Sequence, residues 1–161
     1  MKDKLASVSL ILFLQITIGS SYMTWKQCNN NVDDIKLLNL TVHPDPIIAP
    51  GSVSITITFH TESNLTTPLK AVISLRKKIL IGYFPVPCTS IGSCVYDDLC
   101  TFCAQCNCSV QMGEHTFTLP ITIGSGSWML SGNYQAQIDL ITGSGQKLCI
   151  AINDISIKTK K

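Results

Sequence analysis

The sequence predicts an all-β protein whose antiparallel strands form a two-sheet sandwich or cup. Three observations lead to this fold class. Apolar and polar residues alternate over several short segments, turn-forming residues separate these segments, and no segment sustains a helical period of apolar residues. Because no linker divides the chain, we expect a single domain.

The N-terminal segment has the composition of an export signal. Positive charge at Lys2 and Lys4 precedes an apolar stretch over residues 5–18, and small residues follow it. A membrane-spanning helix needs about 20 predominantly apolar residues, so a membrane anchor is the less favoured interpretation. We expect residues 1–21 to be a signal peptide and residues 22–161 to form the mature domain.

Residues 52–60 show the clearest strand pattern. Their odd-numbered positions are Val, Ile, Ile and Phe, while their even-numbered positions are Ser, Thr or His. Such alternation gives a strand one buried side and one solvent-facing side. Similar alternation predicts strands over residues 35–42, 69–75, 134–140 and 148–152. Turn formers separate these segments, at residues 44–46, 50–51, 124–126, 131–133 and 143–145.

The 8 cysteines all follow the predicted signal peptide, and an even count in an exported chain predicts four disulfides. Cys100, Cys103, Cys106 and Cys108 crowd together in the sequence. Their Cys-x-x-Cys spacing also fits a zinc site or a redox pair, but an oxidising compartment favours disulfides. We therefore expect no metal and no other cofactor.

Sequons support an exported glycoprotein. Asn39 and Asn64 each begin an Asn-x-Thr acceptor sequence, and both are predicted glycosylation sites. A third match at Asn107 has a cysteine in its middle position, which would hide the site if that cysteine is bridged.

Charge and motifs argue against two classes of function. A net charge of +2 is too small for the phosphate neutralisation that a nucleic acid requires. The chain has no nucleophile elbow, no zinc-protease helix and no phosphate-binding loop, and its three histidines are scattered. Adjacent aspartates at residues 33–34 and 97–98 are expected to be solvated loop charges. We therefore expect no enzyme and no catalytic residues.

Two apolar segments lie outside the predicted strands. Residues 79–87 are almost wholly apolar and follow three basic residues, while residues 127–131 form a second cluster flanked by turns. The two segments either close over the core as buried loops, or rim a lipid cavity and enter a bilayer. Under the second interpretation, lipid or membrane contact is expected at Ile79, Leu80, Ile81, Tyr83, Phe84, Trp128, Met129 and Leu130. Attraction to anionic headgroups or to the membrane is expected at Arg76, Lys77 and Lys78.

Several motifs resemble those of the ganglioside GM2 activator family, part of the lipid-recognition ML-domain superfamily. They are Trp25-x-x-Cys28-Asn29, the run over residues 43–51, Pro87-Cys88 with Gly92-Ser93-Cys94, Ser127-Trp128-Met129, and Gly132-Asn133-Tyr134. The resemblance extends from Trp25 to the last predicted strand. It implies a β-cup that encloses an apolar lipid cavity and lifts glycosphingolipid from a peripheral membrane site for hydrolysis by β-hexosaminidase A.

The resemblance also implies the disulfide pairing, because the order of the cysteines matches. The implied pairs are Cys28 with Cys149, Cys88 with Cys94, Cys100 with Cys108, and Cys103 with Cys106. The family carries a longer segment between the cysteines that match Cys100 and Cys108, so lipid binding is better supported here than activation of the hydrolase.

The resemblance implies the lysosome lumen or secretion as the destination. Two alternatives stay open at this point: a general secreted lipid carrier of the same superfamily that activates no enzyme, and an extracellular module that recognises a protein or a glycan. Copurified lipid would distinguish a carrier from such a module.

Overall fold

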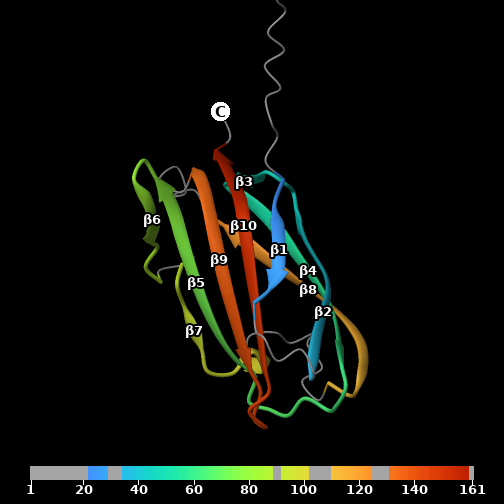
Figure 1. Cartoon of the computed structure of the whole chain (residues 1–161). Helices are drawn as coiled ribbons and strands as arrows, with labels where there is room; N and C mark the ends of the chain where they lie inside the picture. Colours follow the sequence, from blue (N-terminus) through green and yellow to red (C-terminus); the bar gives the residue numbers. More distant parts are fainter. Residues whose placement is uncertain (1–21, 29–33, 89–91, 102–109, 125–130, 160–161) are drawn as a thin grey trace, which may run out of the picture.

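The computed structural model describes residues 22–28, 34–88, 92–101, 110–124 and 131–159. Strands dominate this part of the chain, and one short 3-10 helix interrupts them (Figure 1). The elements are β1 (Thr24–Gln27), β2 (Ile35–His43), β3 (Ile47–Ala49), β4 (Gly51–Thr61), β5 (Lys70–Ile79), β6 (Gly82–Pro85), β7 (Val95–Tyr96), η1 (Leu99–Thr101), β8 (Gly113–Ile123), β9 (Gly132–Ile141) and β10 (Lys147–Thr159).

The strands form two sheets, as the sequence predicts. The larger sheet has the order β1-β10-β9-β5-β6, with β3 added beside β10 and β7 beside β5. The smaller sheet has the order β2-β4-β8. Neighbouring strands are antiparallel except for β3, which runs parallel to the end of β10.

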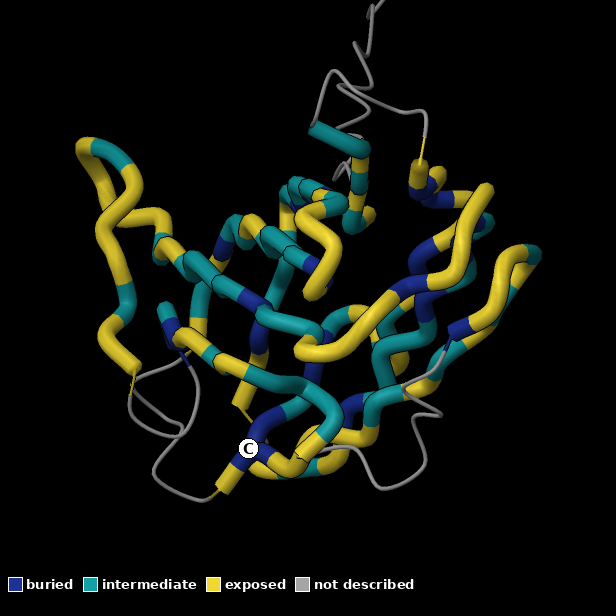
Figure 2. The backbone as a smooth tube through the Cα atoms, turned by 90° about the horizontal axis from the view of Figure 1, so that it is seen from below, coloured by how far each residue is buried: buried dark blue, intermediate teal, exposed yellow. Residues whose placement is uncertain are grey.

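The predicted alternation determines which side chains face the core. On β4, the buried residues Val53, Ile57 and Phe59 all lie on one side of the strand. On β10, Leu148 and Ile150 are likewise buried on one side of the strand. These rows from the two sheets pack against each other in one apolar cluster and a smaller one beside it. Figure 2 shows the buried positions on the inner sides of the layers. Burial of these apolar rows is the main stabilising contribution to such a sandwich.

The two sides of the sandwich differ. On one side, the Gln27 side chain of β1 hydrogen-bonds the backbone of β2, so the two sheets are joined there. On the other side, β8 ends the smaller sheet among the described residues. Its inward row is less covered than that of β4, since Ile121 is 37% exposed and Phe117 and Leu119 are only partly buried.

The structure corrects two expectations about the strands. Residues 79–87 were expected to lie outside strands, yet β5 continues to Ile79 and β6 turns back beside it to form a hairpin. The strand at Gly113–Ile123 was not among the predicted strands, although its residues alternate. Its Pro120 is a residue that disfavours strands by propensity. At the edge of a sheet, however, a proline is tolerated.

Candidate functional site

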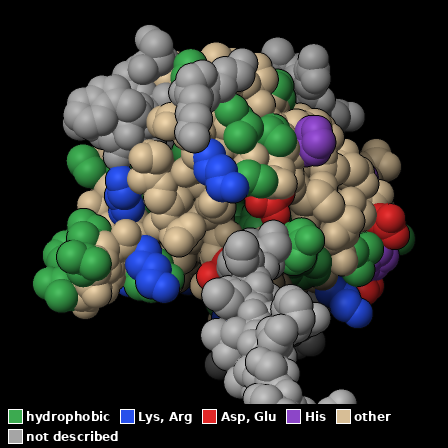
Figure 3. Space-filling model, turned by 90° about the horizontal axis from the view of Figure 1, so that it is seen from above, with side chains coloured by type: hydrophobic (Ala, Val, Ile, Leu, Met, Phe, Trp, Pro, Cys, Tyr) green, Lys and Arg blue, Asp and Glu red, His purple; other side chains and the backbone are tan. Residues whose placement is uncertain are grey.

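The turn between β5 and β6 carries the most exposed apolar side chains of the described chain. Leu80 is 102% exposed and Ile81 is 88% exposed, and Ile79, Tyr83 and Phe84 beside them are also exposed. The hairpin projects from the body as a mostly exposed arm (Figure 2). Viewed from above, its apolar group lies at the edge of the molecule next to Lys and Arg side chains (Figure 3). The structure therefore does not bury these residues as a loop closing over the core.

The hairpin is held firmly at its base. The hydroxyl of Ser93 accepts a hydrogen bond from Leu75 N at 3.0 Å and donates to Leu75 O at 3.1 Å. Val86 N also donates to Leu75 O at 2.8 Å, and a disulfide joins Cys88 to Cys94. These bonds tie both ends of the hairpin to the larger sheet, so the apolar turn is presented on a fixed support.

The three basic residues ahead of the turn do not act as one group. Ala71, Ile73 and Leu75 of β5 pair with Leu140, Ile138 and Ala136 of β9, which pack in the core. Lys77 falls in the same row, because side chains alternate along a strand. Arg76 and Lys78 fall in the opposite row and are exposed. Arg76 and Lys78 thus point to the outer surface and Lys77 points inward, so the three residues expected to attract headgroups or the membrane lie on two different sides of the sheet.

Lys77 lies over an inward-facing aromatic ring. Its Nζ atom is 5.7 Å from the centre of the Tyr134 ring, within the range of a cation–π contact. Tyr134 is only 1% exposed and packs with Ile47, Ala49 and Val53 in the smaller core cluster. Burial raises the pKa of the Tyr134 phenol above its ordinary value of 10.0, because the charged form loses its hydration.

Several predicted site residues lie outside the described residues. They are Trp128, Met129, Leu130, Cys103, Cys106 and Cys108. The neighbours of the Trp128 segment are placed: β8 ends and β9 begins at the end of the sandwich that carries the β5–β6 turn.

Disulfides are seen for five of the cysteines. Cys28 is bonded to Cys149 and Cys88 to Cys94, which are two of the pairs that the resemblance implies. Cys100 is also disulfide-bonded. The first bridge joins the strand that opens the domain to the strand that closes it, and Cys28 N donates to Cys149 O at 2.9 Å beside it.

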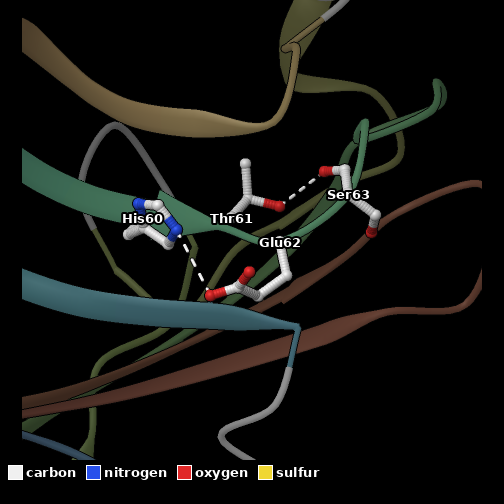
Figure 4. Close-up of polar contacts among 4 residues, drawn as sticks. All are labelled: His60, Thr61, Glu62 and Ser63. Atoms are coloured by element: carbon white, nitrogen blue, oxygen red, sulfur yellow. Dashed lines mark hydrogen bonds and ion pairs between the residues drawn. The ribbon is translucent and has the colours of Figure 1, made fainter.

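Several titratable side chains have structural partners. His60 Nε2 lies 3.3 Å from Glu62 Oε1 on the outer side of β4, and between them Thr61 donates to Ser63 O (Figure 4). Asp98 Oδ1 accepts hydrogen bonds from Leu69 N and Cys100 N, each at 3.1 Å, so it is not the solvated loop charge that we expected. Asp97 forms an ion pair with Lys70.

The part of the chain that the structure describes offers little basis for other kinds of site. Within the described ranges, no group of three His, Cys, Asp or Glu side chains could hold a metal ion. No helix in that part of the chain is long and apolar enough to span a membrane. A half-open hollow of about 370 Å³ is lined by residues that include Val72, Asp139 and Cys149. These three belong to the outward row of the larger sheet, while Leu140 and Leu148, which also line the hollow, belong to the row that packs in the core.

The facing antiparallel sheets with their projecting hairpin define an ML-type β-sandwich. A family model described as "ML domain" matches residues 22–155, and the chain belongs to this family. It is 29% identical over 155 residues to the ganglioside GM2 activator of Macaca fascicularis, covering 80% of each chain. It is 28% identical over 153 residues to the ganglioside GM2 activator of Mus musculus, covering 80% of this chain and 79% of the relative. The resemblance seen in the motifs is thus confirmed.

A solved structure supports the fold. The crystal structure of a Niemann-Pick type C2 protein from Japanese carpenter ant superposes with a TM-score of 0.57 at 10% identity, over 84% of this chain and 99% of that protein. At so low an identity, the likeness concerns the fold alone.

Sequence reasoning missed two features of this site. It did not separate Lys77 from its neighbours, although counting by two from the apolar positions Ala71, Ile73 and Leu75 places Lys77 in their row. It also did not single out Tyr134 as a buried neighbour of Lys77. No local signal reports that contact, because it depends on the pairing of β5 with β9.

Proposed function

We propose that this protein is a non-catalytic lipid carrier that takes glycosphingolipid from a membrane into the space between its two sheets. The observation that carries the proposal is the fixed hairpin whose turn exposes Leu80 and Ile81 at one end of an ML-type sandwich. Two large apolar side chains in full contact with water cost free energy unless they are buried elsewhere. A bilayer interface would bury them, with the Tyr83 ring at headgroup depth.

The energetics of transfer suit such a carrier. Moving an acyl chain from water into an apolar pocket gains about 0.8 kcal/mol per methylene group, but moving it from a bilayer gains almost nothing, because both environments are dry. Smaller contributions then decide the direction of exchange. Arg76 and Lys78, exposed beside the turn, would each add about 1 kcal/mol of attraction to an anionic membrane.

The curated relatives named ganglioside GM2 activators support a finer proposal. The lipid would be a ganglioside, and the protein would present it to a lysosomal hydrolase such as β-hexosaminidase A, in the lysosome lumen or after secretion. The protein would be exported by the signal at residues 1–21 and glycosylated at Asn39 and Asn64, which are both exposed. A general lipid carrier without a hydrolase partner is the second candidate, favoured by the short stretch between Cys100 and Cys108.

Two measurements test these proposals. Fluorescent ganglioside transfer between vesicles, at about pH 4.5 and about pH 7 because histidine side chains ordinarily gain charge over this interval, reports carriage. Turnover of the same ganglioside by β-hexosaminidase A, with and without the protein, reports activation. Transfer with activation supports the ganglioside cofactor, and transfer without it supports the general carrier. If no lipid is transferred and none copurifies with the protein, the lipid-binding proposal is wrong.

A further inference from the structure

One cation on the hairpin faces the interior of the sandwich, where a bound lipid would lie. Lys77 pairs with Tyr134 on one neighbouring strand and with Phe84 on the other. Two residues back along the same row, Leu75 packs with Val86 against the smaller core cluster. The row that leads to Lys77 is therefore apolar, and Lys77 is its first charged position toward the hairpin turn.

The course of the Lys77 side chain supports this placement. A Cβ atom built on Gly132 would lie 3.2 Å from Cε of Lys77, so the lysine stem passes directly over this glycine at the start of β9. Its Nζ atom ends 5.7 Å from the Tyr134 ring centre. The apolar stem covers the end of the core while the ammonium group is held near an aromatic face.

We infer that Lys77 binds the anionic group of the carried lipid, a carboxylate or a phosphate, just inside the end of the sandwich that bears the β5–β6 turn. This inference rests on the proposed function and deepens it. An ammonium group beside apolar side chains interacts with an anion more strongly than one surrounded by water, because the local dielectric constant is lower. Arg76 and Lys78, in the outward row, attract the membrane but do not touch the bound headgroup.

Lipid probes that stay monomeric in solution measure binding of a lipid to the protein without a contribution from attraction of the protein to a membrane. Four short-chain fluorescent probes form two matched pairs: a monosialoganglioside with its asialo form, and phosphatidylglycerol with phosphatidylcholine. We expect Lys77→Gln to weaken binding of an anionic probe about tenfold, which is about 1.4 kcal/mol, and to leave its neutral partner unchanged. Lys77→Arg, which keeps the charge, should stay close to the wild type, and thermal unfolding checks that each variant folds.

Matched variants on the outward row complete the experiment. Arg76→Gln and Lys78→Gln should leave all four affinities unchanged but weaken attachment to anionic vesicles at low salt. Loss for the sialylated probe alone identifies a carboxylate ligand, loss for phosphatidylglycerol alone identifies a phosphate, and loss for both identifies any anion. The inference is overturned if Lys77→Gln leaves both anionic-to-neutral affinity ratios unchanged, or if the outward variants lower them equally. If the wild type binds none of the four probes, the proposed function itself fails.

Discussion

The side-chain amide of Gln27 accepts a hydrogen bond from the backbone N–H of Leu37 at 2.9 Å. The same amide donates to the carbonyl of Ile35, also at 2.9 Å. Gln27 belongs to the larger sheet, while Leu37 and Ile35 belong to the smaller one. One side chain thus completes hydrogen bonds between two sheets whose edge strands do not pair with each other directly, and this fixes the closed side of the sandwich.

Replacing Gln27 should therefore destabilise the fold. Gln27→Leu keeps the size of the side chain but leaves the Leu37 N–H and the Ile35 carbonyl without this partner, at a cost of about 1–3 kcal/mol. Urea unfolding measures the loss. Gln137→Leu is the matched control, since Gln137 is exposed and its amide donates to the side chain of Asp139 on the same strand, and this change should alter stability by less than about 0.5 kcal/mol. Equal effects of the two variants would show that Gln27 does not join the sheets.

The hairpin turn should contribute to attachment of the protein to membranes but not to the stability of the fold. Leu80→Ser with Ile81→Ser removes two exposed apolar side chains, so the free energy of unfolding should change by less than about 0.5 kcal/mol. Sedimentation with vesicles should show weaker attachment. Met112→Ser is the control, because Met112 is 70% exposed and lies next to the start of β8, at the other end of the sandwich. If both variants retain full attachment, the turn is not the contact surface.

The two described disulfides should differ in what they contribute. Cys28 and Cys149 lie 121 positions apart in the sequence, and Cys88 and Cys94 lie 6 positions apart. A bridge restricts the unfolded chain more when it closes a longer loop, giving about 5 kcal/mol for the first pair and about 2 kcal/mol for the second. Denaturant unfolding of each paired Cys→Ala variant tests the difference. A larger loss for the short loop would contradict it.

Tyr134 should make stability sensitive to alkaline pH. Because burial raises the pKa of its phenol above 10.0, the folded state keeps the proton that the unfolded state loses first. This contribution is complete below pH 10.0 and is lost as the pH rises through the folded-state pKa. Between about pH 8 and about pH 11, the free energy of unfolding should fall more steeply for the wild type than for Tyr134→Phe. Tyr83→Phe, at an exposed position, should follow the wild type.

Alternation along the chain was enough to predict the fold class and the five strands β2, β4, β5, β9 and β10, because buried and exposed side chains alternate along such strands. The strand at Gly113–Ile123 was not predicted. It contains a proline, a residue that is tolerated at the edge of a sheet, and the place of a strand within a sheet cannot be read from local sequence. The apolar turn was predicted as a contact site by composition, and the structure adds that it is exposed. The separate role of Lys77 could not emerge from composition, because it depends on strand parity and on the ring of Tyr134 from another strand.

The outer edge of β8, which pairs with no other described strand, also bears on whether these molecules associate with one another. An edge strand offers unpaired backbone donors and acceptors, and a second molecule can extend the sheet by pairing with them, which is a route to polymerisation. Pro120 interrupts this edge with a residue that has no N–H to donate, and Glu114 places a charge near its start. The proline that obscured the strand in the sequence thus protects the assembled sheet against growth from one molecule to the next.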